Sequence, residues 1–248
     1  MKQQVINLGV DIFQIYTLPI EQLAKNQLSE LFDSQDYLKI FGDSLITSYQ
    51  FTNKRDFQDN TRQLPELLPQ GQSSHIVDSQ GVALSSSYWL KTGTPATLLN
   101  KRIRKNSQFT IITTVATADI NQIGPARIIS ISSGILRRNF TLGQQQNDLD
   151  LRIRTPLTGE NATDIKLSIP GIFANTNTHN IVLTYSKANI QVYVDNVQNY
   201  YSLNLLEINT ERAEAIVLCT NLYSFRNLLN ISNYYRQKKN NFLQAVVS

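Results

Sequence analysis

Short runs of alternating apolar and polar residues fill the segment from residue 109 to residue 196, and they constrain the fold most. Alternation with a period of two predicts β-strands that bury one face. Turn-forming residues separate these runs, and no helical pattern lies between them. Strands without intervening helices favour an antiparallel sandwich over a parallel sheet. The predicted strands are residues 109–118, 126–133, 138–144, 148–155, 179–186 and 189–196.

The strands at residues 138–144 and 148–155 show the clearest division into two faces. Only Gln145, Gln146 and Asn147 separate them, as in a β-hairpin. The apolar face consists of Phe140, Leu142, Leu149, Leu151 and Ile153. The polar face consists of Asn139, Thr141, Asp150, Arg152 and Arg154. The hairpin therefore predicts one core-facing side and one polar side.

Outside this region the pattern changes. Leu23, Leu28, Leu31 and Phe32 recur near the helical period, so residues 1–42 predict a helical N-terminal flank. The strand pattern begins at Ser44–Phe51 and continues to about residue 205. Residues 206–248 predict a helical or frayed C-terminal flank. We expect one all-β, antiparallel jelly-roll sandwich over residues 43–205, between the two flanks.

Composition excludes several classes of protein. The chain has 248 residues, 41% hydrophobic and 17% charged, with a net charge of +4. The apolar share is sufficient for a core, and no stretch of about 18 apolar residues predicts a membrane-spanning helix. The N-terminus lacks the features of a secretory signal, so this segment predicts a cytosolic chain or a fragment targeted by another element.

Metal and nucleic-acid binding are not expected from the residue types. Cys219 is the only cysteine, and His75 and His179 lie far apart, so no zinc site is predicted. A nucleic-acid binder usually has a basic stripe. The densest basic cluster is Lys101, Arg102, Arg104 and Lys105, which we interpret as a solvated surface.

The closing strands, THNIVLTYS and NIQVYVDN, carry a more specific pattern. With the preceding strands they resemble the laminin-G-like, concanavalin A-like jelly rolls of lectins and glucanases. That family closes with His-His-Val-x-Val-Thr-Tyr-Asp-Gly and Tyr-Val-Asp-Gly. The matching residues are His179, Thr184, Tyr185, Tyr193, Val194 and Asp195. The sequence departs at both turns, where Ser186-Lys187 and Asn196 replace Asp-Gly and Gly.

More narrowly, RRNFTLGQ and LRIRTPLTGEN look like the laminin-G-like segment attached to bacterial VanZ-like membrane proteins. The resemblance covers about residues 45–203. It implies a location on the extracytoplasmic face of the cell envelope. Contact with a membrane would then run through a fused or partner protein.

The resemblance covers both enzymes and binding modules, and the acidic residues favour a binding module. Retaining glucanases use two carboxylates about 5–5.5 Å apart, and the family's Glu-x-Asp-x-x-Glu motif is absent. Between residues 43 and 205 the only glutamates are Glu66 and Glu160, both in predicted loops. Asp148 and Asp150 form the closest acidic pair, which we interpret as a hairpin end. We therefore expect a non-catalytic chain, with a glycan hydrolase of this class as the alternative.

Recognition of a carbohydrate or a protein partner requires less specialised chemistry. The polar hairpin face offers amide, hydroxyl and guanidinium groups that bind sugars and anions, and an aromatic side chain can stack on a sugar ring. The candidate binding residues are Asn139, Thr141, Arg152, Arg154 and Trp89. Asp119 and Asp164 are weaker candidates for calcium, and no other cofactor is expected. A purely structural domain of a membrane protein is the remaining alternative.

Overall fold

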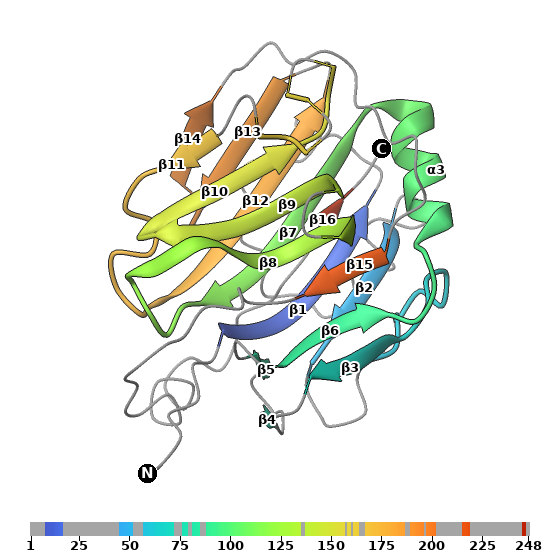
Figure 1. Ribbon diagram of the computed structural model, residues 1–248, viewed down its shortest axis with the longest axis horizontal. Helices are drawn as coiled ribbons and strands as arrows, with labels where there is room; N and C mark the ends of the chain where they lie inside the picture. Colours follow the sequence, from blue (N-terminus) through green and yellow to red (C-terminus); the bar gives the residue numbers. More distant parts are fainter. Residues whose placement is uncertain are drawn as a thin grey trace.

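The protein, studied as a computed structural model, consists mainly of antiparallel β-sheets with little helix (Figure 1). The prediction of an all-β chain is confirmed at this level. The structure describes residues 8–16, 45–51, 57–71, 76–78, 81–84, 88–134, 137–156, 158–159, 161–163, 167–186, 189–195, 197–201, 215–218 and 245–246.

Among these residues a nine-stranded sheet, termed sheet A, has the order β14-β13-β12-β7-β1-β5-β4, with β2 paired to β1 and β16 paired to β7. Its strand β7 is rich in β-branched residues, which suit a pleated and buried strand. All eight residues of β7 are buried. The strands are β1 (Leu8–Tyr16), β2 (Leu45–Gln50), β4 (Ile76–Asp78), β5 (Gly81–Leu84), β7 (Phe109–Ala116), β12 (Thr178–Ser186), β13 (Asn189–Val194), β14 (Val197–Tyr201) and β16 (Ala245–Val246).

The second sheet, termed sheet B, has seven described strands in the order β11-β10-β9-β8-β15-β6-β3. The predicted hairpin forms its β9–β10 pair, with Leu142 opposite Leu151 and Thr141 opposite Arg152. The strands are β3 (Leu67–Gly71), β6 (Tyr88–Thr92), β8 (Gln122–Gly134), β9 (Arg137–Gln146), β10 (Asp148–Ile153), β11 (Leu167–Ile169) and β15 (Ala215–Leu218).

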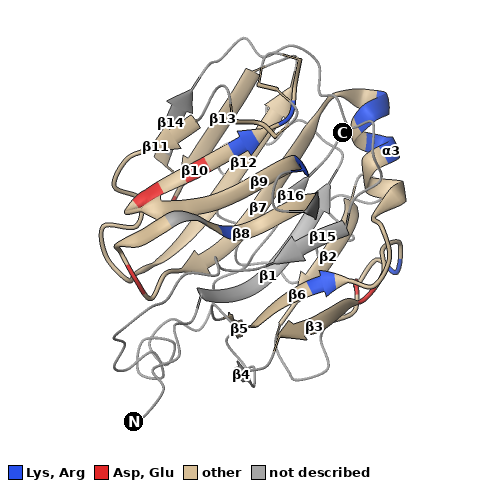
Figure 2. Cartoon of the chain, in the orientation of Figure 1, with Lys and Arg blue, Asp and Glu red and all other residues tan. Residues whose placement is uncertain are grey.

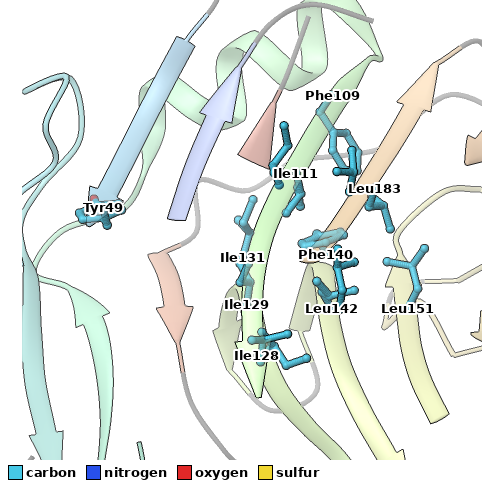
Figure 3. Packing of buried hydrophobic residues seen from close by; sticks show 14 of the residues in the cluster. Tyr49, Phe109, Ile111, Ile128, Ile129, Ile131, Phe140, Leu142, Leu151 and Leu183 are labelled. Carbon is cyan, nitrogen blue, oxygen red and sulfur yellow. The ribbon is translucent and has the colours of Figure 1, made fainter. Parts of the chain in front are cut away.

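The hydrophobic core lies between the two sheets (Figure 3). Phe109 of β7 meets Phe140 of β9 edge to face, with 5.5 Å between ring centroids. Phe109 also stacks on Tyr185 of β12 at 5.6 Å. Leu142 and Leu183 are fully enclosed beside these rings. Each enclosed side chain of this size contributes about 1.5–3 kcal/mol through the apolar surface it removes from water.

Both predicted helical flanks contain strands. Residues 8–16 form β1, which pairs with β2, β5 and β7 inside sheet A. Residues 215–218 form β15 between β6 and β8. The helical prediction is therefore wrong for these two segments, because tertiary pairing decides the state of a short apolar run. The predicted stripe from Leu23 to Phe32 lies outside the described residues.

One helix of the described part, α3 (Thr97–Asn106), was not predicted from the sequence. It buries Leu99, Asn100 and Ile103, whose spacing places them on one helix face. It ends at Ser107, which adopts a left-handed conformation and donates its N–H to the carbonyl of Ile103. No helix among the described residues has the length and apolar character needed to span a membrane.

Candidate functional site

The polar candidates lie on the outer face of sheet B, the face directed away from the core. Strand register aligns Lys91, Ser130, Thr141 and Arg152 in one row across β6, β8, β9 and β10, with Val217 of β15 in register between Lys91 and Ser130. Paired positions in an antiparallel sheet share a face. The register thus joins side chains from distant parts of the sequence into one surface.

Four of the five sequence candidates come together in the β9–β10 hairpin. Thr141 is opposite Arg152, and the backbone N–H of Arg154 donates to the carbonyl of Asn139 at 2.8 Å. All four are enclosed: Asn139 is 2% exposed, Thr141 0%, and Arg152 and Arg154 6% each. The polar face of this hairpin is therefore enclosed, and a binding role for these residues stays a prediction.

Two of the enclosed candidates are engaged within the protein. The hydroxyl of Thr141 lies 2.8 Å from the hydroxyl of Ser130 on the neighbouring strand. The side-chain amide of Asn139 donates to the Asn100 side chain of α3 at 3.3 Å. These hydrogen bonds connect β9 to β8 and to the helix, which is a structural role.

The charged side chains of the outer face include one ion pair and further arginines on the neighbouring strands. Nε of Arg152 donates to a carboxylate oxygen of Asp150 at 2.8 Å, and both side chains are enclosed. Arg127 lies opposite Gly143, which in turn lies opposite Asp150. Figure 2 shows basic positions on three neighbouring strands, β8, β9 and β10, whereas the acidic positions among these strands lie on β10.

Arg127 and Arg138 belong to this surface because of β-bulges. The register between β8 and β9 slips at Arg127/Ile129 and again at Ile131/Ser132. Each slip inserts one extra residue and reverses the alternation beyond it. Strict alternation from Phe140 would place Arg138 on the core side, but Arg138 pairs with Ser132 instead. Sequence reasoning missed both arginines for this reason.

We term the residues Arg127, Arg138, Asp150, Arg152 and Arg154 the arginine patch. The pKa of Arg138 is lowered to about 10, first by burial and then by the positive charges of Arg152 and Arg127, with Asp150 acting in the opposite direction. Burial of like charges disfavours the protonated guanidinium. The patch thus has an excess of positive charge in a region of low solvent access.

Trp89 occupies the same face at a distance from the hairpin. It lies on β6, two residues from Lys91 of the polar row, and it is half-buried. Four strand spacings of about 4.8 Å separate β6 from β10, roughly 19 Å in total. Trp89 is therefore too far from Arg152 for both side chains to contact the same sugar ring.

The calcium candidates gain no support from the described residues. A carboxylate oxygen of Asp119 accepts the backbone N–H of Asn121 at 2.8 Å, as in an Asx turn. Asp164 lies outside the described residues. Within the described part of the chain, no group of three or more His, Cys, Asp or Glu side chains could hold a metal ion.

The acidic pair and the histidine of the closing strands hold strand ends together. Asp148 accepts hydrogen bonds from Gly171 N–H at 3.0 Å and from the Ser168 hydroxyl at 3.1 Å. Nδ1 of His179 lies 2.8 Å from a carboxylate oxygen of Asp195. These contacts join β10 to β11 and β12 to the end of β13, which explains these residue types in structural terms.

Comparison with known proteins gives relatives in structure alone. No family model matches this sequence, and no curated protein matches it. The fold is similar to that of the binding domain of botulinum neurotoxin serotype D/C, with a TM-score of 0.57 and 14% identity. That match covers 76% of this chain and 46% of the neurotoxin domain.

Two further solved structures give a similar result. A structure of botulinum neurotoxin type C, whose cell entry depends on two ganglioside molecules, matches 71% of this chain and 42% of that chain. Its TM-score is 0.53 at 13% identity. The binding domain of Paraclostridial Mosquitocidal Protein 1 gives 0.53 at 11% identity, over 71% of this chain and 44% of that one. The chain thus spans less than half of each of these structures, and the likeness shows a shared all-β fold.

Proposed function

We propose that the protein is a non-catalytic binding module that recognises a carbohydrate or a protein partner at the cell envelope through the outer face of sheet B. Within that proposal, the laminin-G-like, concanavalin A-like class is the family assignment suggested by the closing strands. The VanZ-like association stays a hypothesis that follows from the hairpin sequence.

The observation that carries the proposal is the chemistry of the outer face. Lys91, Ser130, Thr141 and Arg152 form one row across the sheet, and Trp89 lies beside Lys91. Ser130 and Thr141 are fully enclosed and lie within hydrogen-bond distance of each other, so the groups of this face that a sugar can reach most easily are the exposed Lys91 and the half-buried Trp89. A cationic donor beside an aromatic ring supplies the hydrogen bonds and the stacking surface that sugars require.

The neighbouring folds support recognition over catalysis. Solved structures with this fold include neurotoxin binding domains, one in complex with synaptotagmin and one in complex with a sialylated ligand. The acidic groups support the same conclusion, because Asp148 accepts hydrogen bonds from β11 and the adjoining turn and Asp150 holds Arg152. A retaining hydrolase needs one carboxylate free to attack and one to donate a proton.

A glycan array combined with a reducing-sugar release assay tests the proposal. Trp89 is the chain's only tryptophan, so its fluorescence reports directly on ligand binding to the outer face. We expect binding of a glycan or a protein partner, a change in Trp89 emission, and no release of reducing sugar. Hydrolysis of a β-glucan that is abolished by Asp148→Asn would establish the hydrolase alternative and overturn the binding module.

A further inference from the structure

The arginine patch has more buried positive charge than its described residues balance. Arg138, Arg152 and Arg154 are 7%, 6% and 6% exposed, and Asp150 is 2% exposed. A buried charge is normally compensated by an opposite charge together with hydrogen bonds. One carboxylate among these side chains leaves an excess of positive charge.

Arg152 and Arg154 have unused donors. In the described part of the structure, Arg152 uses only Nε, which donates to Asp150. Within the same part, the Arg154 side chain makes no hydrogen bond or ion pair, and only its backbone N–H is engaged. No nitrogen of Arg152 or Arg154 is among the described polar atoms that are fully enclosed and unbonded.

The spacing of these two residues suits an anion. Residues i and i+2 of a strand lie on one face, about 7 Å apart along the strand. Each guanidinium is a rigid planar fork that can bind a carboxylate or sulfate through two parallel hydrogen bonds. Asp150 holds Arg152 through Nε, which orients the guanidinium and uses neither of its terminal nitrogens.

We propose that Arg152 and Arg154 bind an oxyanion, the carboxylate or sulfate group of an acidic glycan. This inference rests on the proposed binding function and names the class of ligand. Arg127 and Arg138 contribute to the positive field around the site, since both lie on the same face beside Asp150. A bound anion offsets the repulsion among these guanidinium groups.

Arg154→Gln is the sharpest variant, because the Arg154 side chain has no partner among the described residues whose loss could unfold the protein. Its matched control is Lys101→Gln, which removes one positive charge from an exposed position of α3. Arg154→Lys keeps the charge and removes the planar fork. Circular dichroism and the thermal midpoint check that each variant folds.

Titration with sodium sulfate against sodium chloride at equal ionic strength gives the first measurement. We expect sulfate to raise the thermal midpoint, because a ligand that binds only the folded state stabilises it. Sulfate also stabilises folded proteins in general, because it is excluded from their surface, so the specific effect is the part of the shift that depends on Arg154. Arg154→Gln should reduce the shift most, Arg154→Lys should reduce it less, and Lys101→Gln should leave it unchanged. A shift in Arg154→Gln equal to that of the wild-type protein would overturn the assignment.

Oligosaccharides then distinguish the source of the anion. The experiment compares a sulfated, a sialylated and a neutral glycan of equal length. Trp89 fluorescence measures the binding of each glycan. Loss of one charge-assisted fork should weaken the acidic ligand by about tenfold or more in Arg154→Gln. Binding of the neutral glycan as tightly as both acidic ones would refute the inference and leave the binding module intact. If the full glycan and protein screen finds no ligand, the proposed function itself fails.

Discussion

The two faces of the β9–β10 hairpin are buried almost equally but have opposite chemistry. On the inner face, Phe140, Leu142 and Leu151 are 3%, 0% and 3% exposed. On the outer face, Asp150 and Arg152 are 2% and 6% exposed. The inner residues pack against Phe109 and its neighbours in sheet A, whereas the outer pair holds a single ion pair.

This difference shows that burial alone does not indicate what a residue contributes. Apolar burial on the inner face stabilises the fold in proportion to the surface removed from water. A buried ion pair gives little net stability, because desolvation of both charges offsets their attraction. The ion pair of the outer face therefore adds less to net stability than the apolar packing of the inner face.

The largest expected effect comes from truncation of the inner face. Phe140→Ala removes the ring that meets Phe109 between the sheets, and we expect a loss of about 3–5 kcal/mol in the free energy of unfolding. Urea denaturation followed by circular dichroism measures it. Leu68→Ala is the control, since Leu68 is 41% exposed and should change stability by less than about 0.5 kcal/mol. Equal losses for both variants would contradict the role of this face.

The ion pair of the outer face gives the next effect. Asp150→Asn leaves Arg152 buried without its counter-charge, and we expect a loss of about 3 kcal/mol. A double-mutant cycle with Arg152→Gln checks the cause, because the double variant should recover part of the loss. Strict additivity of the two single variants would show that this contact is energetically irrelevant.

A smaller effect tests how the bulge positions Arg127. A Cβ at Gly143 would lie 2.7 Å from the backbone carbonyl oxygen of Ala126, so Gly143→Ala must displace the bulged strand. We expect a loss of about 1–3 kcal/mol, with weaker anion binding. At Gly93 the Cβ would meet Leu68 Cδ1 at 3.0 Å, a flexible group, and Gly93→Ala serves as the matched control. Unchanged stability in Gly143→Ala would argue against a rigid bulge.

The smallest effect concerns a polar group on the core side. The Tyr49 hydroxyl donates to the Pro65 carbonyl at 2.6 Å, and Tyr49→Phe should cost about 1 kcal/mol at neutral pH. Burial, with a smaller effect of Asp59, raises the pKa of Tyr49 far above its ordinary value. The unfolded state therefore loses this proton first, and stability falls as the pH rises above about 10.

Urea midpoints between about pH 9 and pH 11 test this pH dependence. Tyr49→Phe should show a shallower decline than the wild-type protein, because it removes one of the groups responsible. Burial also raises the pKa of Tyr88 to about 12, so part of the decline should remain in the variant. Identical slopes in both proteins would exclude Tyr49 as a source.

Local pattern predicted the strands well and their environment poorly. The strands expected at 179–186 and 189–196 correspond to β12 and β13 within two residues at each end. Alternation also assigned the two hairpin faces correctly, because a side chain on a regular strand reverses direction at each residue. Alternation could not show that the polar face is enclosed, since burial of a face depends on what lies against it.

The candidate site likewise has features that the local sequence pattern predicts and features that depend on tertiary structure. The sequence by itself determined an all-β antiparallel chain and the neighbourhood of Thr141, Arg152 and Arg154, because these features depend on local periodicity and a tight turn. Tertiary structure alone decided that β1 and β15 enter the sheets, since short apolar runs take their state from the strands they pair with. It also decided that Arg127 and Arg138 join the patch, because each β-bulge reverses the alternation on which sequence reasoning depends.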